Sequence, residues 1–152
     1  MLLADVFVWD GKELVVRAGE DIESDLLNAM SFLRDGMVQQ GYRMYDAEHG
    51  ARFAVDELML AITPTSVIGF NVAETWFSPE KIIGEEFIGP RIGCVVDMAD
   101  AVACLSAIAK RAGCPRVCLG TRSNSRHVAL ARLLERTGCR ISTIELTKEI
   151  IL

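Results

Sequence analysis

The stretch that decides the fold is DMADAVACLSAIAKRAG, residues 97–113, which predicts one long helix with its own start and stop signals. Asp97 can cap the N-terminus of this helix with its carboxylate. Lys110, Arg111 and Gly113 are favourable chemistry at its C-terminus. The apolar residues that follow the helical period are Met98, Ala101, Val102, Leu105, Ile108 and Ala109. The segments on either side decide to which kind of fold this helix belongs.

Two strand-like segments precede the helix. Residues 67–77 form the first, with a possible bulge at Gly69, and residues 81–88 form the second. The turn Ser78-Pro79-Glu80 separates them, and Gly89-Pro90 ends the second. The centre of the molecule is therefore expected to be antiparallel.

The N-terminal third predicts a β-hairpin followed by two helices. Residues 4–9 and 12–17 are strand-like, and Asp10-Gly11 between them is a two-residue hairpin signal. Asp21 can cap a first helix that Gly36 ends. A second helix is expected over residues 47–60, although residues 59–62 could instead start a strand, because the period of so short an apolar run does not distinguish the two.

Downstream of the long helix, residues 116–120 predict a short buried strand and Ser125 can cap a helix that Gly138 closes. Residues 139–147 predict a last strand. The whole pattern predicts an α/β (α+β) fold: a mixed, mainly antiparallel central sheet flanked by helices, with an extra N-terminal hairpin strand. Residues 1–152 show no repeat or linker and are assigned to a single domain.

Composition restricts the partners that we expect. The chain is 51% hydrophobic and 24% charged, with a formal net charge of −5. Its apolar runs fall short of the roughly 20 residues that span a membrane, and its N-terminus lacks a secretory pattern. Basic residues are scattered, apart from one cluster: Arg116, Arg122, Arg126, Arg132, Arg136 and Arg140. We expect a cytoplasmic protein that binds neither membranes nor nucleic acid directly, since nucleic-acid binding needs a broader positive face.

Cysteine and histidine give no metal-binding pattern. The five cysteines lie at positions 94, 104, 114, 118 and 139, without a C-x-x-C pair. Reduced thiols that act as small buried hydrophobic groups are the expectation. His49 follows two acidic residues but lacks the second histidine of a zinc-protease motif, so no metal site is predicted.

Several phrases, in this order, resemble one family. Residues 14–21 resemble the family's first strand and its turn into a helix, residues 76–88 the central hairpin, and residues 116–120 the fifth strand. Residues 127–139, which end LARLLERTGC, are similar to the closing helix and its glycine turn. The family is the GNAT superfamily of N-acetyltransferases, and the resemblance covers residues 14–147.

The resemblance implies that acetyl-CoA would be held by a basic, glycine-rich turn at the start of the long helix. Here that turn is Arg91-Ile92-Gly93-Cys94-Val95-Val96, which keeps one arginine and one glycine at a different spacing. Candidate cofactor-binding residues are Arg91, Gly93, Cys94 and His127, the last at a position where the family often has asparagine. Asp97 and Asp100 would repel a diphosphate. We therefore expect no cofactor, or acetyl-CoA if the protein is active.

The resemblance also implies a general acid and a general base. The family's tyrosine acid would fall at Leu134, which has no proton to give. A glutamate on the fourth strand of the family can act as a base through water, and Glu85 or Glu86 lies there. One of these two should face the cleft, because strand neighbours point to opposite faces.

The functional expectation is a degenerate GNAT-like domain that works as a binding or assembly component with a protein partner. Such domains resemble those encoded by tailed bacteriophages, including virion proteins, so a location in a virion is the second expectation. The added hairpin offers an edge for pairing with another chain. The alternative is an active acetyl-CoA-dependent N-acetyltransferase with an atypical cofactor loop, and a different α/β binding module is the third possibility.

Overall fold

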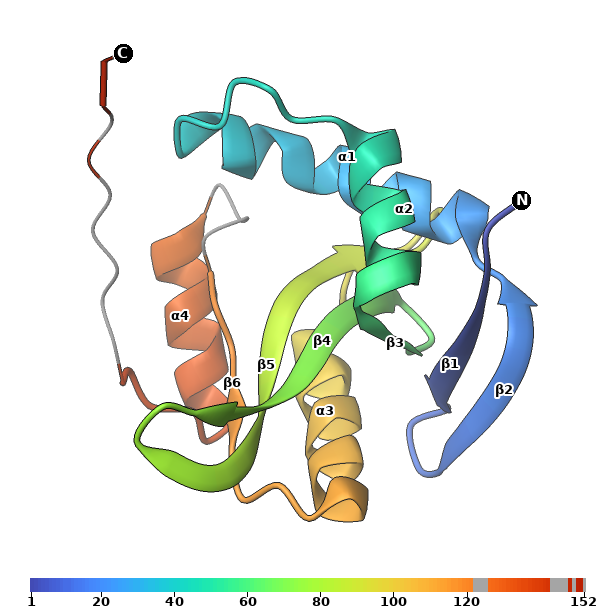
Figure 1. The fold of residues 1–152 in the computed structure, drawn as a ribbon, viewed down its shortest axis with the longest axis vertical. Coiled ribbons are helices and arrows are strands. Elements are labelled where there is room, and N and C mark those ends of the chain that lie inside the picture. Colours follow the sequence, from blue (N-terminus) through green and yellow to red (C-terminus); the bar gives the residue numbers. More distant parts are fainter. Residues whose placement is uncertain (122–125, 143–147, 149, 152) are drawn as a thin grey trace.

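The central sheet has the predicted mixed, mainly antiparallel character (Figure 1). The computed structural model describes residues 1–121, 126–142, 148, 150 and 151. In these residues the elements are β1 (Leu3–Trp9), β2 (Leu14–Asp21), α1 (Glu23–Gln39), α2 (Ala47–Glu57), β3 (Met59–Ile62), β4 (Ser66–Thr75), β5 (Ser78–Pro90), α3 (Met98–Ala112), β6 (Val117–Cys118) and α4 (His127–Arg136). The strand order is β2-β1-β3-β4-β5-β6, and the parallel pairs are β1 with β3 and β5 with β6. The predicted fold class, including the extra N-terminal hairpin, is confirmed.

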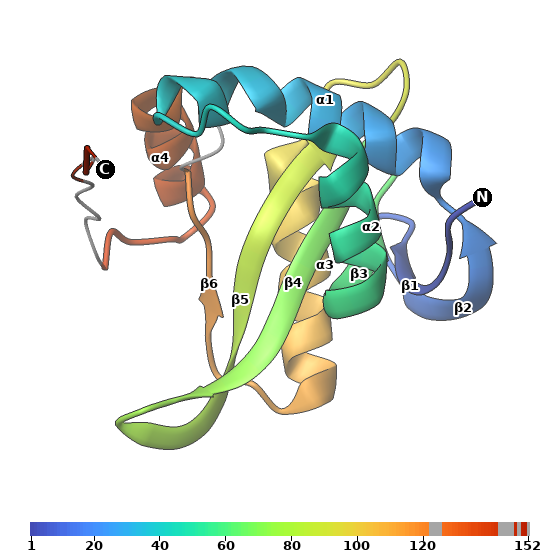
Figure 2. The ribbon, with the colours of Figure 1, turned by 45° about the horizontal axis from the view of Figure 1, so that its top comes forward.

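Helices cover both faces of the sheet. One core cluster joins α1 and α2 to the sheet through residues such as Leu26, Ala54 and Leu60. The second joins α3 to the other face through residues such as Leu105 and Phe70. Figure 2 shows α2 in front of the sheet, α3 behind it and α1 across one end. The long helix that decided the prediction is therefore buried against the sheet.

A bulge in β5 lets one strand supply both cores. Ile83 belongs to the α3-side core, whereas Phe87 belongs to the core under α1 and α2. Residues four apart share a face in a regular strand. Gly69 pairs with Phe87 and Phe70 with Glu85, so Glu86 is the extra residue that reverses the faces. The bulge expected at Gly69 is confirmed, and its additional residue lies on the opposite strand.

The N-terminal hairpin has an internal strand and an edge strand. β1 lies between β2 and β3, which leaves β2 at the open edge. The predicted two-residue turn is wrong: β1 ends at Trp9 and β2 starts at Leu14. Asp10 holds this longer turn because its carboxylate accepts from the backbone N–H groups of Lys12 and Glu13, both at 2.8 Å. These bonds lower the pKa of Asp10.

The first two helices differ from the prediction at their ends. The first continues through Gly36 to Gln39. Gly36 is buried, and its packing offsets the roughly 1 kcal/mol that glycine costs in a helix. Ile22, rather than Asp21, stands at its N-cap. The second helix ends at Glu57, and residues 59–62 form a strand, which is the alternative that the pattern left open.

In the second half of the chain, β5 is longer than predicted, whereas β4 and β6 are shorter. The β4–β5 turn lies at Trp76-Phe77 rather than at residues 78–80, because Thr75 pairs with Ser78. Pro79 is accommodated inside β5 because, in the part of the chain that the structure describes, no third strand pairs with β5 at that point. β6 covers two residues instead of 116–120.

Only some of the predictions for the C-terminal region fall on residues that the structure describes. Asp97 and Gly113 cap α3 as predicted. Residues 139–142 are not in a strand, so this part of the predicted last strand is wrong. The Ser125 cap and residues 143–147 lie outside the described residues.

Candidate functional site

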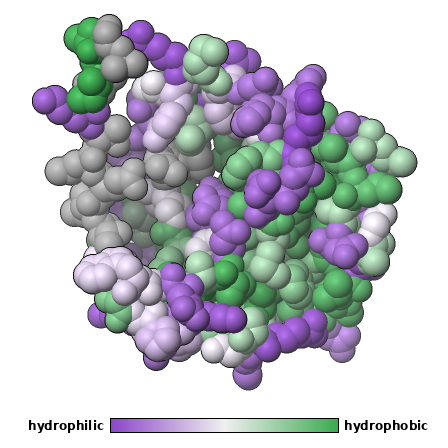
Figure 3. Space-filling view, in the orientation of Figure 1, coloured by the Kyte–Doolittle hydropathy of each residue, from purple (hydrophilic) through white to green (hydrophobic). Residues whose placement is uncertain are grey.

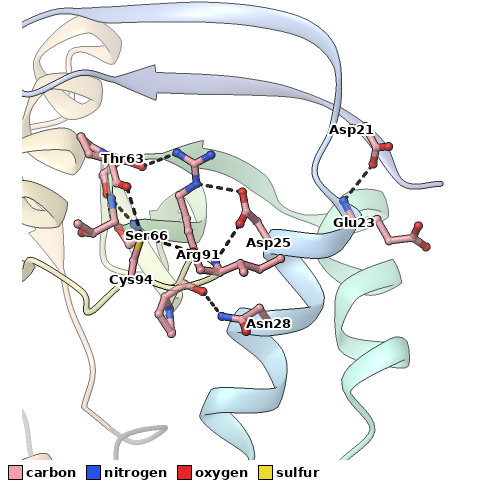
Figure 4. Close-up of polar contacts among 12 residues, drawn as sticks. Asp21, Glu23, Asp25, Asn28, Thr63, Ser66, Arg91 and Cys94 are labelled. Carbon is pink, nitrogen blue, oxygen red and sulfur yellow. Dashed lines mark hydrogen bonds and ion pairs between the residues drawn. The ribbon is translucent and has the colours of Figure 1, made fainter.

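The loop of residues 91–97 joins the end of β5 to α3, where the sequence placed the cofactor turn. Arg91 points back under α1: its Nε donates to Oδ2 of Asp25 at 2.9 Å, and its Nη1 donates to the carbonyl oxygen of Thr63 at 3.3 Å (Figure 4). The Arg91 side chain is 36% exposed and that of Asp25 is 22% exposed. The guanidinium is thus engaged by groups of the chain itself and is partly buried.

Backbone donors of the same loop are also engaged. The N–H of Ile92 donates to Oδ1 of Asp25 at 3.0 Å, so the two oxygens of one carboxylate hold both the side chain and the backbone at the start of the loop. The N–H of Cys94 donates to the carbonyl of Arg91 at 3.0 Å. The N–H of Asp97 donates to Oγ1 of Thr65 at 2.9 Å. Gly93, with φ +73°, makes the turn that these bonds close.

The N-terminus of α3 is capped by the chain itself. Asp97 accepts from the N–H of Asp100 at 3.2 Å, and Asp100 adds a second carboxylate in the first turn. Both carboxylates satisfy the positive end of the helix dipole. Exposed Val95, at 89%, stands on the outer side of the loop.

Behind the loop lies a small buried polar cluster at the β3–β4 turn. The hydroxyls of Thr63 and Ser66 are 2.6 Å apart, and both residues are buried. Asn28 of α1 donates from Nδ2 to the carbonyl of Pro90 at 3.0 Å. Together with Asp25, this contact fixes α1 over the end of β5. No local pattern in the sequence indicates Asp25 or Thr63, because their partner Arg91 lies far along the chain.

Glu85 and Glu86 occupy the bulge of β5 and reach in different directions. The Oε2 atom of Glu85 accepts from the N–H of Gly120, just past β6, at 3.0 Å. The Oε1 atom of Glu86 accepts from Nδ2 of Asn71 at 3.4 Å. Glu85 is half-buried and Glu86 is exposed. Of the two predicted bases, Glu85 is therefore the one fixed between β5 and the segment that follows β6.

His127 does not join the loop residues. It is exposed at the first position of α4, and within the described part of the chain it forms no polar contact with Arg91, Gly93 or Cys94. Leu134, which stands where the family has its tyrosine, is 5% exposed. The structure thus brings Arg91, Gly93 and Cys94 together in one loop and leaves His127 separate.

An apolar groove beside the N-terminal hairpin is a feature that the sequence analysis missed. It has a volume of about 670 Å³ and lies between β1, β2 and the end of α2, with Val16, Val55 and Leu58 among its lining residues. Val16 is 57% exposed and Met59, also in the lining, is 40% exposed. Figure 3 shows hydrophobic side chains gathered on this side of the molecule, over β1 and β2. Strand alternation alone assigns such residues to a face and does not show that the face is open.

The aromatic residues singled out in the sequence have different roles. Tyr45 is half-buried and donates from its hydroxyl to the carbonyl of Met30 at 2.6 Å; burial raises its pKa. Trp9 packs beside the α3-side core. Trp76 is 96% exposed and Phe77 is 71% exposed. The last two residues occupy the tip of the β4–β5 hairpin.

No site for a metal ion is found among the described residues, and all five cysteines are free thiols. Burial and the nearby Asp100 carboxylate raise the pKa of Cys104 to about 12. None of the helices in the described residues is long and apolar enough to cross a membrane.

Comparison with family models and with curated proteins finds no match to this chain. The resemblance to the GNAT superfamily therefore stays a prediction from the residues. The structure itself shows a mixed, mainly antiparallel sheet flanked by helices.

Proposed function

We infer that this chain is a protein-binding or assembly component with an acetyltransferase-like architecture, and that ordinary acetyl transfer is not its role. One observation carries the inference: the Asp25 carboxylate binds both the Arg91 guanidinium and the Ile92 N–H. A helix start binds a diphosphate through free N–H groups and nearby cations. Here an internal anion already uses these donors, and Asp97 and Asp100 add negative charge. The residues present do not fit a coenzyme diphosphate.

The apolar groove supports a binding role. Its lining is mostly aliphatic, and it lies next to β2, the open edge of the sheet. An edge strand with exposed Val15 and Val16 offers backbone groups for strand addition and side chains for packing. A groove of this kind suits an extended, apolar segment of a protein partner.

Thermal unfolding in the presence of coenzyme A and acetyl-CoA tests the proposal. A ligand at a hundredfold its dissociation constant stabilises the native state by about 2.7 kcal/mol, so binding would raise the melting temperature clearly. We expect no shift for the natural chain. The proposal would be overturned if acetyl-CoA raised the melting temperature and fragments of the coenzyme that lack the diphosphate did not.

The Asp25→Ala variant tests whether the Asp25 carboxylate is the group that prevents coenzyme binding. It removes the acceptor of both the Arg91 Nε–H and the Ile92 N–H. If the carboxylate closes the loop, a coenzyme-dependent shift appears in the variant alone. Near-ultraviolet circular dichroism of the variant, compared with the natural chain, establishes that it is folded.

The second candidate function is an active N-acetyltransferase, and the position of Glu85 favours it. The carboxylate is half-buried and fixed by the Gly120 N–H at a strand bulge, and bulges recur beside active sites. In this reading Glu85, or Glu86 beside it, acts as the base. Acetylation of a panel of primary amines that disappears in Glu85→Gln would establish it.

We also propose that the chain belongs with the degenerate domains of this kind that tailed bacteriophages encode. The support is the resemblance of residues 127–139, taken together with the closed loop. Capsid and tail genes beside its own gene are the expected finding, and mass spectrometry of purified virions is the direct measurement. A metabolic operon would contradict the proposal and favour the enzyme.

A further inference from the structure

The β4–β5 hairpin carries an exposed aromatic pair, which we call the aromatic tip: Trp76 and Phe77. Their ring centroids are 5.4 Å apart and the rings meet at 88°, an edge-to-face arrangement. Beyond Phe70 of β4 and before Ile83 of β5, the two strands pair only with each other. The tip therefore projects from the sheet on a two-stranded ribbon, as Figures 1 and 2 show.

Such a tip is an anchor for a partner surface. Aromatic side chains bury roughly 150–250 Å² each, so the pair supplies about half of the roughly 800 Å² that one side of a standard interface buries. Glu74 and Glu80 flank it, and Lys81 lies opposite Glu74 in the ladder, which leaves one negative charge in excess. A negative rim disfavours both an anionic membrane and a nucleic-acid backbone.

The chain itself carries a surface with the complementary chemistry on α4. At 100° per residue, Leu130, Ala131 and Leu134 share the inward side, and of these Leu134 is buried. The opposite side, which we call the outer arc of α4, consists of Val128, Ala129, Arg132, Leu133 and Arg136. Val128 is 57% exposed and Leu133 is 41% exposed. Among the described residues, no ion pair engages the two arginines.

We propose that the aromatic tip of one copy of this chain docks on the outer arc of α4 of a second copy. Three kinds of contact favour this partner. The aromatic rings can pack against Val128 and Leu133, and an arginine guanidinium can lie over the face of Trp76. Glu80 can form an ion pair with the same arginines. The apolar groove is a less suitable binding surface for the tip. Asp56 and Glu57, which are next to its lining residues in sequence, are negatively charged and would repel the glutamates that flank the tip.

The two surfaces lie apart in one molecule, so the contact forms between molecules. Figure 2 shows α4 toward one end and the hairpin tip at the other. A tip-to-helix contact is heterologous, and heterologous contacts build rings or open chains rather than closed dimers. This inference deepens the assembly role proposed above by naming a partner, and its test is separate from the coenzyme experiment.

Sedimentation velocity of the full chain over a range of concentrations tests the proposal. We expect species larger than a dimer to grow with concentration. Trp76→Ala should weaken association at least about thirty-fold, the effect of truncating an interface hot spot. The paired change Arg132→Glu with Arg136→Glu should do the same. Phe32→Ala and Arg17→Glu change an exposed aromatic and an exposed arginine elsewhere, and are expected to have no effect.

Mixing the two classes of variant gives the decisive result. The Trp76→Ala chain retains its outer arc, and the chain with both arginines reversed retains its tip. Together they should form a one-to-one heterodimer and nothing larger, because a single intact junction is present. A natural chain that stays monomeric at its solubility limit, or association that survives Trp76→Ala, overturns the proposal.

A vesicle experiment provides a further outcome. Flotation of the natural chain with anionic phospholipid vesicles should leave the protein unbound. Binding that depends on Trp76 would mean that the tip inserts into a lipid surface, and would overturn the proposal. The coenzyme experiment tests the proposed function, and sedimentation tests the contact between the tip and α4. A negative result in one of them therefore leaves the other proposal standing.

Discussion

At the residue scale, glycine positions decide how closely the layers approach. A Cβ built at Gly69 would lie 2.2 Å from Cε1 of Phe87, and one built at Gly89 would lie 2.6 Å from Cβ of Ala29. The first glycine makes room for the ring that the β5 bulge turns toward α1 and α2. The second lets α1 contact the backbone of β5. Neither requirement follows from turn geometry, because both glycines lie within strands.

We expect Gly69→Ala to destabilise the protein by roughly 1–3 kcal/mol, the range for overpacking in a core. The added methyl must displace the Phe87 ring, which is 6% exposed. Chemical denaturation measures the loss. Gly84→Ala, in β5 with no atom within 4 Å of its Cβ position, is the matched control and should cost little. Equal losses in the two variants would contradict the close packing.

Cys104 predicts a pH dependence of stability. Burial and Asp100 raise the pKa of this thiol from 9.0 to about 12 in the folded chain, so folding favours the protonated form. The contribution is complete below pH 9.0 and is lost as the pH rises above it, at about 1.4 kcal/mol per pH unit.

Denaturation of the natural chain and of Cys104→Ala at pH values from neutral to above 9.0 checks this dependence. The difference in stability between the two chains should shrink as the pH rises. A difference that stays constant would show that the thiol titrates alike in the folded and unfolded chains.

At the element scale, the caps of α3 act as the sequence predicts. Asp97 accepts from Asp100, and Gly113 adopts the left-handed conformation with φ 70° at the C-cap. This helix carries the α3-side core, so its ends matter for the whole sheet. The first helix is the contrast, since its N-cap residue, Ile22, has no capping side chain and is held by burial, at 3% exposed. The Asp21 carboxylate just before it accepts from the N–H of Glu23 at 3.2 Å.

We expect Asp97→Ala to lower the free energy of unfolding by about 1 kcal/mol, the usual cost of a lost N-cap. Thermal or chemical unfolding measures it. Asp56→Ala removes an exposed carboxylate near the C-terminus of α2, where negative charge opposes the helix dipole, and should be neutral or slightly stabilising. A loss of the same size in both variants would argue against the cap.

At the scale of the whole molecule, Asp25 and Asn28 connect α1 to the end of β5 and to the loop before α3. The contact between Asp25 and Arg91 spans 66 residues of sequence. Through it, α1 fixes the loop of residues 91–97, where the sequence placed the cofactor turn and from which α3 begins. The engagement of the donors in that loop is therefore a property of the assembled layers.

We expect Asp25→Ala to cost roughly 1–3 kcal/mol, because it leaves a partly buried guanidinium and one backbone N–H without their acceptor. Glu23→Ala removes a neighbouring carboxylate that pairs with the N-terminal amine at 3.4 Å, and should cost less than about 1 kcal/mol. Equal effects in denaturation would show that the bond between Asp25 and Arg91 does not stabilise the loop.

The candidate site was predictable only in outline. Arg91, Gly93 and Cys94 share the loop that the sequence indicated, and Asp97 and Asp100 stand at the helix start as expected. What engages that loop was not predictable, because Asp25 and Thr63 come from other elements. The different reach of Glu85 and Glu86 follows from a bulge, which depends on the register with β4.

Apart from β3 and the predicted last strand, the sequence by itself determined the order of elements, the antiparallel centre and the caps of α3, because periodicity, capping residues and turn residues act over a few positions. The tertiary structure decided the helix that continues through Gly36, the strand at residues 59–62, the closed loop at Arg91 and the exposure of Trp76. The physical reason is the sequence separation of the interacting residues. Burial and hydrogen bonding between residues far apart in the chain outweigh local preferences of about 1 kcal/mol.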